Sequence, residues 1–315
     1  MPEKKTMQFA NFNITFGETP NPKPMLTYLK EIIFPTFKNE YIRGDGGETQ
    51  FYFSDVKIKF LHKEYILVGN LIKNTHYEIK TKIEDDKLIE APSVVPTAPY
   101  SRFMILLKNH RMILLKNETR SPDIRSFQKT YRTFISKTLF SYNKGKPKED
   151  RIPAPDVNIV DIPLPSAKIE NELAKFEKIS NLTLKLFPLN NDFDTSNMIK
   201  AVRGTMNLVG SKSSNIIINS PSISEGIKDV FENSNGIAKV FAKGKDKSGK
   251  KIKLSTDAFS SNSEFVYNGN VSEKNDDFII RYAYNTATEI MNNTSASNLE
   301  LYNGFVEEYS ESDFN

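Results

Sequence analysis

The stretch "RFMILLKNHRMILL", Arg102–Leu115, decides how the first half of the chain folds. Two apolar runs, Phe103–Leu107 and Met112–Leu115, flank the polar segment Lys108–Arg111, which contains an Asn. Runs of strand-forming residues on both sides of a short polar segment are typical of a β-hairpin. They are also the longest apolar runs in the chain, so no segment has the length that a membrane-spanning helix needs.

A helix is expected directly after this hairpin, in "SPDIRSFQKTYRTFISKTLF", residues 121–140. Ser121 is the expected N-cap, with Pro122 at the first helical position, where the missing N–H does no harm. Apolar residues recur at spacings of three and four, and Tyr131 belongs to this core-facing stripe. The basic residues off the stripe are Arg125, Lys129, Arg132 and Lys137. The pattern predicts an amphipathic helix with a basic outer side.

The first hundred residues predict a mixed meander. Alternation of apolar and polar residues predicts strands, and one segment, 23–34, has helical spacing. The expected strands are 9–16, 51–60, 65–71 and 77–83.

A boundary is expected at "NKGKPKEDRIPAPDVNIVDIPLP", residues 143–165, because five prolines occur there among few periodic apolar positions. The fold class predicted is therefore α+β, with two mixed α/β domains, 1–142 and 166–315, joined by this proline-rich linker. The second domain is expected to begin with a helix capped by Ser166. Its further helices are expected near 196–208, after Pro221 and near 278–291, and its first strands at 182–186 and 215–219.

A lysine-rich stretch, "FAKGKDKSGKKIKLS" at 241–255, comes close to the phosphate-binding pattern G-x4-G-K-[ST]. Lys251 stands where that pattern needs Ser or Thr, and the residues after it alternate like a strand instead of opening a helix. We therefore expect a hairpin that turns at 246–249. Its inward residues would be Ala238, Val240, Ala242, Ile252 and Leu254, and its outward residues Lys239, Phe241, Lys243, Lys245, Lys251 and Lys253.

Charge is distributed unevenly along the chain, although the formal net charge is only +4. Basic residues dominate in two zones, 120–148 and 198–253, whereas 271–315 is acidic and is expected to be a solvated end. The chain has no cysteine, which excludes disulfides, thiolate zinc sites and thiol nucleophiles. With no apolar leader after Met1, a soluble cytoplasmic protein is the expectation.

Catalytic patterns are weak. His62, His76 and His110 are scattered without metal-ligand spacing, and no G-x-S-x-G motif occurs. A metal-dependent nuclease remains an alternative, because Asp55 and the cluster 84–86 supply the carboxylates that two-metal cleavage needs. We expect no cofactor, no metal and no enzymatic activity.

Five features follow one another along the chain: the hairpin 102–115, the helix that Ser121 and Pro122 begin, the proline-rich segment, "SSNIIINSPSISEGIKDVFEN" and the lysine hairpin. This order resembles that of RexA-type phage-exclusion proteins and of the DNA-binding subunit of the Kiwa defence system. The resemblance extends over about 102–287. It implies a cytoplasmic homodimer of two α/β domains that binds double-stranded DNA without sequence preference in defence against phage. RexA-type proteins also act with a membrane partner.

Sequence-independent DNA binding agrees with the two basic zones, because phosphate contacts need Lys and Arg but no base-reading side chains. The expected DNA-contacting residues are Arg125, Lys129, Arg132, Lys239, Phe241, Lys243, Lys245, Lys247, Lys250, Lys251 and Lys253. The alternatives are the nuclease and a non-enzymatic interaction or structural protein whose lysines have no specific ligand.

Overall fold

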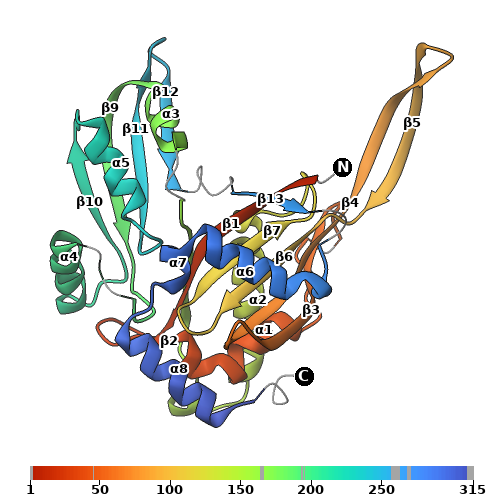
Figure 1. The fold of residues 1–315 in the computed structure, drawn as a ribbon. Helices are drawn as coiled ribbons and strands as arrows, with labels where there is room; N and C mark the ends of the chain where they lie inside the picture. The colour runs from red at the N-terminus through yellow and green to blue at the C-terminus, as the bar shows by residue number, and fades with distance from the viewer. Residues whose placement is uncertain are drawn as a thin grey trace.

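The computed structural model describes residues 3–44, 46–163, 167–192, 194, 196–256, 263–267 and 271–310. Within them, a nine-stranded sheet forms the centre of the molecule, with the strand order β13-β1-β7-β6-β4-β3 (Figure 1). Beside this path, β2 and β8 pair with β1, and β5 pairs with β4. The bounds are β1 Glu3–Phe16, β2 Lys23–Pro24, β3 Gln50–Leu61, β4 Glu64–Glu84, β5 Lys87–Thr97, β6 Tyr100–Leu106, β7 Arg111–Lys116, β8 Pro155–Asp161 and β13 Ser263–Tyr267.

The predicted hairpin is confirmed as β6 and β7, which lie in the middle of this sheet. Successive side chains of a strand point to opposite faces. Phe103 and Ile105 enter one core and Met104 and Leu106 the other, all fully buried. Burial on both faces explains why the two runs are apolar without alternation.

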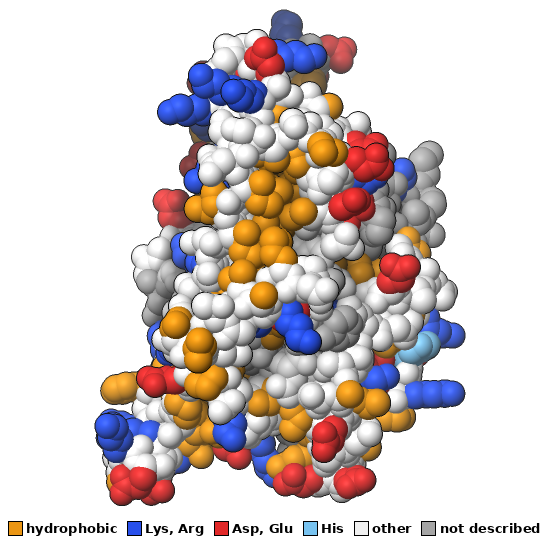
Figure 2. Space-filling view, turned by 90° about the vertical axis from the view of Figure 1, so that its left-hand side faces the viewer, with side chains coloured by type: hydrophobic (Ala, Val, Ile, Leu, Met, Phe, Trp, Pro, Cys, Tyr) orange, Lys and Arg blue, Asp and Glu red, His pale blue; other side chains and the backbone are white. Residues whose placement is uncertain are grey.

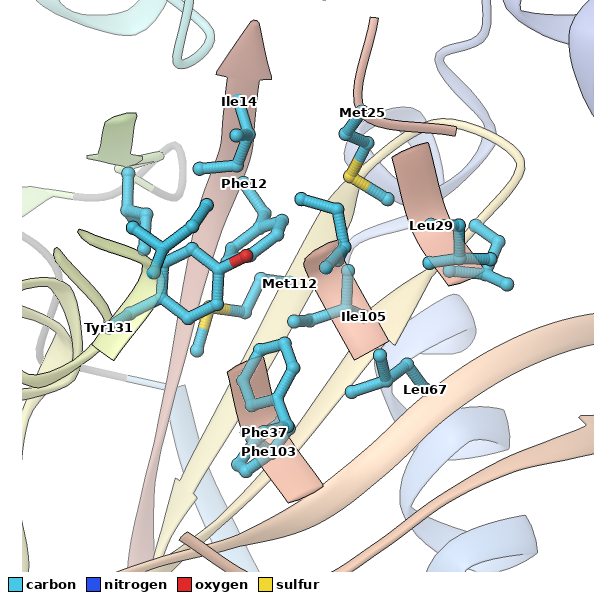
Figure 3. Packing of buried hydrophobic residues seen from close by; sticks show 14 of the residues in the cluster. Phe12, Ile14, Met25, Leu29, Phe37, Leu67, Phe103, Ile105, Met112 and Tyr131 are labelled. Carbon is cyan, nitrogen blue, oxygen red and sulfur yellow. The ribbon is translucent and has the colours of Figure 1, made fainter. Parts of the chain in front are cut away.

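Helices cover both faces of the sheet. On one face lie η1 Met25–Tyr28, η2 Leu29–Ile33, α1 Phe34–Lys38 and α2 Ile124–Asn143, around Phe12, Phe37 and Tyr131 (Figure 3). On the other face lie α6 Asp276–Thr286 and α7 Thr288–Asn292. α8, Ala296–Glu308, adds Tyr302 and Phe305 to the first core. Two short 3-10 turns, η3 Lys148–Asp150 and η5 Glu273–Asn275, complete this part.

The helix predicted after the hairpin is confirmed, but its cap was assigned wrongly. Asp123 is the N-cap of α2 and accepts a hydrogen bond from the Ser126 N–H at 2.8 Å. Ser121 lies before the helix, where its Oγ accepts from the Glu118 N–H. Ser and Asp are both good caps, and here the Asp three residues before Ser126 reaches the first turn.

A second, four-stranded sheet has the order β10-β9-β11-β12. Its core lies on one face only, against three helices that contribute Ile169, Ile199, Met206, Ile227 and Phe231. The opposite face has no helix of the described residues in its core. The bounds are β9 Phe176–Leu186, β10 Ser214–Asn219, β11 Ala238–Asp246, β12 Lys251–Ser255, α3 Ala167–Leu173, α4 Asn197–Leu208 and α5 Ser224–Glu232.

The domain boundaries differ from the prediction, although the α+β class is confirmed. The segment 143–165 is not a free linker, because its residues 155–161 form β8 and pair with β1 over seven positions. The acidic segment after 271 is not a solvated end, because α6 and α7 cover the first sheet. Ser166, the predicted helix cap, lies outside the described residues.

The strands predicted at 65–71 and 77–83 are one strand, β4. Beyond about Thr75, β4 pairs with β5 alone and forms a two-stranded arm, Thr75–Thr97, that projects from the sheet (Figure 1). None of its residues belongs to a buried core cluster of the described chain. No helix among the described residues is long and apolar enough to cross a membrane.

Candidate nucleic-acid interface

The lysine hairpin forms as predicted from β11 and β12. Ala238, Val240 and Ala242 are fully buried against the helices, and Leu254 joins them. Lys243 lies opposite Lys253 in the register, and Lys245 lies opposite Lys251. All four are exposed, as are Lys247 and Lys250 at the turn.

β9 extends this surface with residues that the sequence did not assign to it. Lys185, Thr183 and Asn181 lie opposite Lys239, Phe241 and Lys243, and beyond a bulge Lys178 lies opposite Lys245. Facing residues of paired strands share one side of the sheet. The alternation of Leu182, Leu184 and Leu186 already indicated that 181, 183 and 185 point outward, but it could not indicate β11 as the neighbour. We call this surface the lysine face: Lys178, Asn181, Thr183, Lys185, Lys239, Phe241, Lys243, Lys245, Lys251 and Lys253.

The open face of the second sheet carries lysines close to one another. Like charges directly opposite on paired strands repel each other. Nevertheless, Lys243, Lys245 and Lys251 form no ion pair with any described residue. On the helix side, Glu170, Glu225 and Glu232 lie around Lys228. In Figure 2, Lys and Arg side chains gather at the upper left of the molecule.

One aromatic ring lies within the lysine face. Phe241 is half-buried, and the Lys253 ammonium lies 4.4 Å from its ring centroid. A cation over an aromatic face is favourable, so Lys253 is held over the sheet and does not extend freely into solvent.

The turn of the hairpin is rigidly built. Asp246 Oδ1 accepts hydrogen bonds from the Ser248 hydroxyl at 2.7 Å and from the N–H groups of Ser248 and Lys250 at 2.9 and 3.0 Å. These bonds, led by the one from the Ser248 hydroxyl, lower the pKa of the Asp246 carboxyl. Gly249 has φ +81°, a conformation that glycine adopts at no steric cost.

Arg132, on the basic side of α2, packs against β8. Arg132 Nε donates to the Val157 carbonyl at 3.1 Å, which holds the guanidinium against β8. Burial raises the pKa of the neighbouring Asp156, while the charges of Arg132, Lys212 and Lys185 act in the opposite direction. Arg132 of the first basic zone and Lys212 of the second therefore both act on the Asp156 carboxyl group.

The remaining predicted residues of α2 are less close to this point. Lys129 and Arg125 are exposed, and Arg125 lies about 10 Å further along the helix axis at 1.5 Å per residue. A hollow of about 670 Å³ between α2 and β8 adds Lys144 and Arg151 beside Arg132. The structure thus places Arg132 beside β8, whereas Arg125 and Lys129 lie further along the helix.

The carboxylates of the nuclease alternative are not brought together. Asp55 accepts from Asn70 at 2.9 Å, whereas Glu84, Asp85 and Asp86 form the tip of the arm. Asn70 and Glu84 are fourteen residues apart on one strand, about 45 Å at the strand rise. No three His, Cys, Asp or Glu side chains of the described residues are grouped as a metal site would require. His62 and His76 are exposed, and His110 is fully buried.

No protein-family model, no curated protein and no solved structure matches this chain. The lysine face is therefore the feature from which a function is inferred.

Proposed function

We propose that this protein binds double-stranded DNA without sequence preference, through the lysine face and the basic side of α2. The observation that carries the proposal is an open sheet face with lysines directly opposite one another, three of which form no ion pair with any described residue. A phosphate backbone relieves that repulsion, and each phosphate neutralised releases counterions.

The chemistry of the face favours backbone contact over base reading. Of the side chains that read base edges by paired hydrogen bonds, the lysine face carries no Arg and no Gln, and its lysines can contact guanine as well as phosphate. Its one Asn, Asn181, already donates to Asn219 Oδ1 at 2.7 Å. Lys acts as a point charge on a flexible stem and adapts to phosphates of any sequence.

The biological setting that we propose is defence against phage, because of the resemblance to RexA-type proteins. In that setting the protein is a cytoplasmic homodimer without enzymatic activity, and a membrane protein is its partner. Binding along any DNA is what such a role requires, since the sequence of the invading genome is not known in advance.

The test is the DNA affinity at several salt concentrations. For the natural protein, log K should fall linearly with log salt. In the variant Lys243→Gln, Lys245→Gln, Lys251→Gln, Lys253→Gln the slope should flatten by about 3–4, at about 0.9 for each phosphate that the protein no longer neutralises.

A matched control removes the same charge elsewhere. Lys63, Lys80, Lys82 and Lys87 are exposed in the β3–β4 turn and the arm, and their change to Gln should leave the slope unchanged. Equal slopes for the two quadruple variants would mean that only net charge matters, and the lysine face would then have no binding role. Tighter binding of double-stranded RNA than of double-stranded DNA would contradict DNA as the ligand and indicate RNA in its place.

A further inference from the structure

The second sheet has an edge at β10. Among the described strands, β9 alone pairs with β10. The Ser220 N–H, one residue beyond β10, donates to the Ser180 carbonyl at 2.8 Å. Because N–H and C=O directions alternate along a strand, those of Asn215, Ile217 and Asn219 point away from β9. An edge with such groups is a template for another strand.

This edge also lacks the usual protection. Natural sheets blunt exposed edges with Lys or Pro, and the opposite edge strand, β12, carries Lys251 and Lys253. β10 contains neither a charge nor a proline. Instead its Ile217 is 57% exposed and its Ile218 is 37% exposed.

Further apolar side chains of this unit are exposed. Leu208 is 86% exposed at the end of α4, with Val209 beside it, and Ile223, just before α5, is 73% exposed. Figure 2 shows a band of hydrophobic side chains on this side of the molecule. A contiguous apolar patch on a protein surface marks an interaction site more often than chance.

The sequence of β10 indicates which partner this edge accommodates. Residues 215–219 are Asn-Ile-Ile-Ile-Asn, which reads the same in both directions. In an antiparallel pair of two copies centred on Ile217, Asn215 lies opposite Asn219 twice and Ile216 lies opposite Ile218 twice. The residues whose backbone groups point outward, 215, 217 and 219, then face one another, so all of these N–H and C=O groups are paired.

We propose that β10 pairs antiparallel with β10 of a second copy of this chain and joins the two four-stranded sheets into one of eight strands. The contact is isologous, as a two-fold dimer requires. No lysine lies on β10, so the junction places no like charges opposite each other. Facing residues share one side of a sheet, and therefore both lysine faces lie on the same side of the dimer.

The pairing depends on the β10 edge and not on DNA, so it can be tested without the proposed function. Only one consequence rests on the proposed function, namely that the two lysine faces on one side of the dimer double the DNA-binding surface. A monomeric edge variant that still bound DNA through the lysine face would support both proposals, whereas a dimer without DNA affinity would overturn the proposed function only.

Cysteine cross-linking tests the register, because the chain has no cysteine of its own. Residues paired across an antiparallel ladder have Cα atoms about 5.5 Å apart, within reach of a disulfide. Ile217→Cys should therefore cross-link to itself on mild oxidation. Asn215→Cys alone should not, because its two copies lie about 13 Å apart at the strand rise. A mixture of Asn215→Cys and Asn219→Cys chains should cross-link.

The molar mass by light scattering tests the interface itself. The natural protein should have twice the mass of the 35.9 kDa chain, and Ile217→Lys should have the mass of one chain. Ile83→Lys, at another exposed isoleucine near the arm tip, is the matched control and should remain dimeric. A natural protein of 35.9 kDa, a dimeric Ile217→Lys or a dimer in which Ile217→Cys fails to cross-link would each show that the proposal is wrong.

Discussion

At the scale of single residues, the buried charges are the part of the structure furthest from what the sequence indicates. Arg102 is the third residue of β6, and its partner Asp276 lies 174 residues away. Two bonds join them, from Nε at 2.9 Å and Nη2 at 2.7 Å, and both side chains are 2% exposed. Lys59 also reaches Asp276 at 3.0 Å. The acidic composition of the C-terminal segment predicted solvent exposure, and it could not indicate which carboxylate is buried in an ion pair.

Removal of the Asp276 charge should destabilise the protein. Asp276→Asn leaves the Arg102 guanidinium buried without a counter-charge, and we expect the free energy of unfolding to fall by about 3–5 kcal/mol. Urea denaturation measures it. Asp277→Asn removes an exposed carboxylate that pairs with Arg281 on the same helix, and it should change stability by less than about 1 kcal/mol. Similar losses in the two variants would contradict a buried pair.

His110 should make stability depend on pH. The side chain is fully buried, and burial, with the nearby Arg111 charge, lowers its pKa from 6.5 to about 3. Below pH 6.5 the unfolded chain binds a proton that the folded protein does not. The free energy of unfolding should therefore fall by up to about 1.4 kcal/mol per pH unit as the pH decreases from 6.5 to 3.

The variant His110→Asn isolates this contribution, because Asn tolerates the positive φ of 59° at this turn. Denaturation of both proteins between about pH 7 and pH 4 should show the natural protein losing more stability. His62→Asn, at an exposed residue with a similar φ, should follow the natural curve. Parallel curves for the natural protein and His110→Asn would refute the assignment.

At the scale of elements, alternation predicted strands well and their partners poorly. The faces of β11 and β12 were predicted correctly, because period-two patterns depend only on neighbouring residues. That β9 lies beside β11 depends on contacts about sixty residues away, so the four residues that β9 adds to the lysine face were not predicted. The strand β8 was not predicted because prolines favour a linker. Pro155 is the first residue of β8, and the strand pairs with β1 alone, so the missing N–H of proline is tolerated there.

Gly244 should be essential for the pairing of β11 with β9. A Cβ there would lie 2.0 Å from the Lys178 carbonyl oxygen, at the bulge in the ladder. We expect Gly244→Ala to cost about 1–3 kcal/mol and to raise hydrogen exchange at the amides of β9. Gly249→Ala meets no atom within 4 Å and strains only the turn. Unchanged hydrogen exchange at the amides of β9 in both variants would contradict the close approach of Gly244 to the Lys178 carbonyl.

At the scale of the whole molecule, the α+β class could be predicted and the division of the chain could not. The first sheet takes strands from the beginning, the middle and the end of the sequence, since β1 pairs with both β8 and β13. The unit with the lysine face is inserted between them. Pairings between segments so far apart in the sequence leave no local signal, whereas a proline-rich segment looks like a boundary wherever it lies.

The arm should be dispensable for folding. Replacement of residues 78–94 by Asn-Gly removes no residue of a buried cluster, so the melting temperature should change by only a few degrees. Thermal unfolding followed by circular dichroism measures this. Leu71→Ala, in the fully buried part of the same strand, should cost about 2–5 kcal/mol. Unfolding of the shortened protein at room temperature would show that the arm supports the sheet.

The inserted arrangement has a consequence for synthesis on the ribosome. Chains emerge N-terminus first, and domains fold as they emerge. The inserted unit, 167–256, is complete before β13 and α6–α8 have been made. At that moment Met104, Leu106, Ile113 and Leu115 still lack the helices that cover them. A nascent chain therefore presents a finished lysine face together with a bare apolar sheet, and translation stopped at this point yields a charged, aggregation-prone fragment.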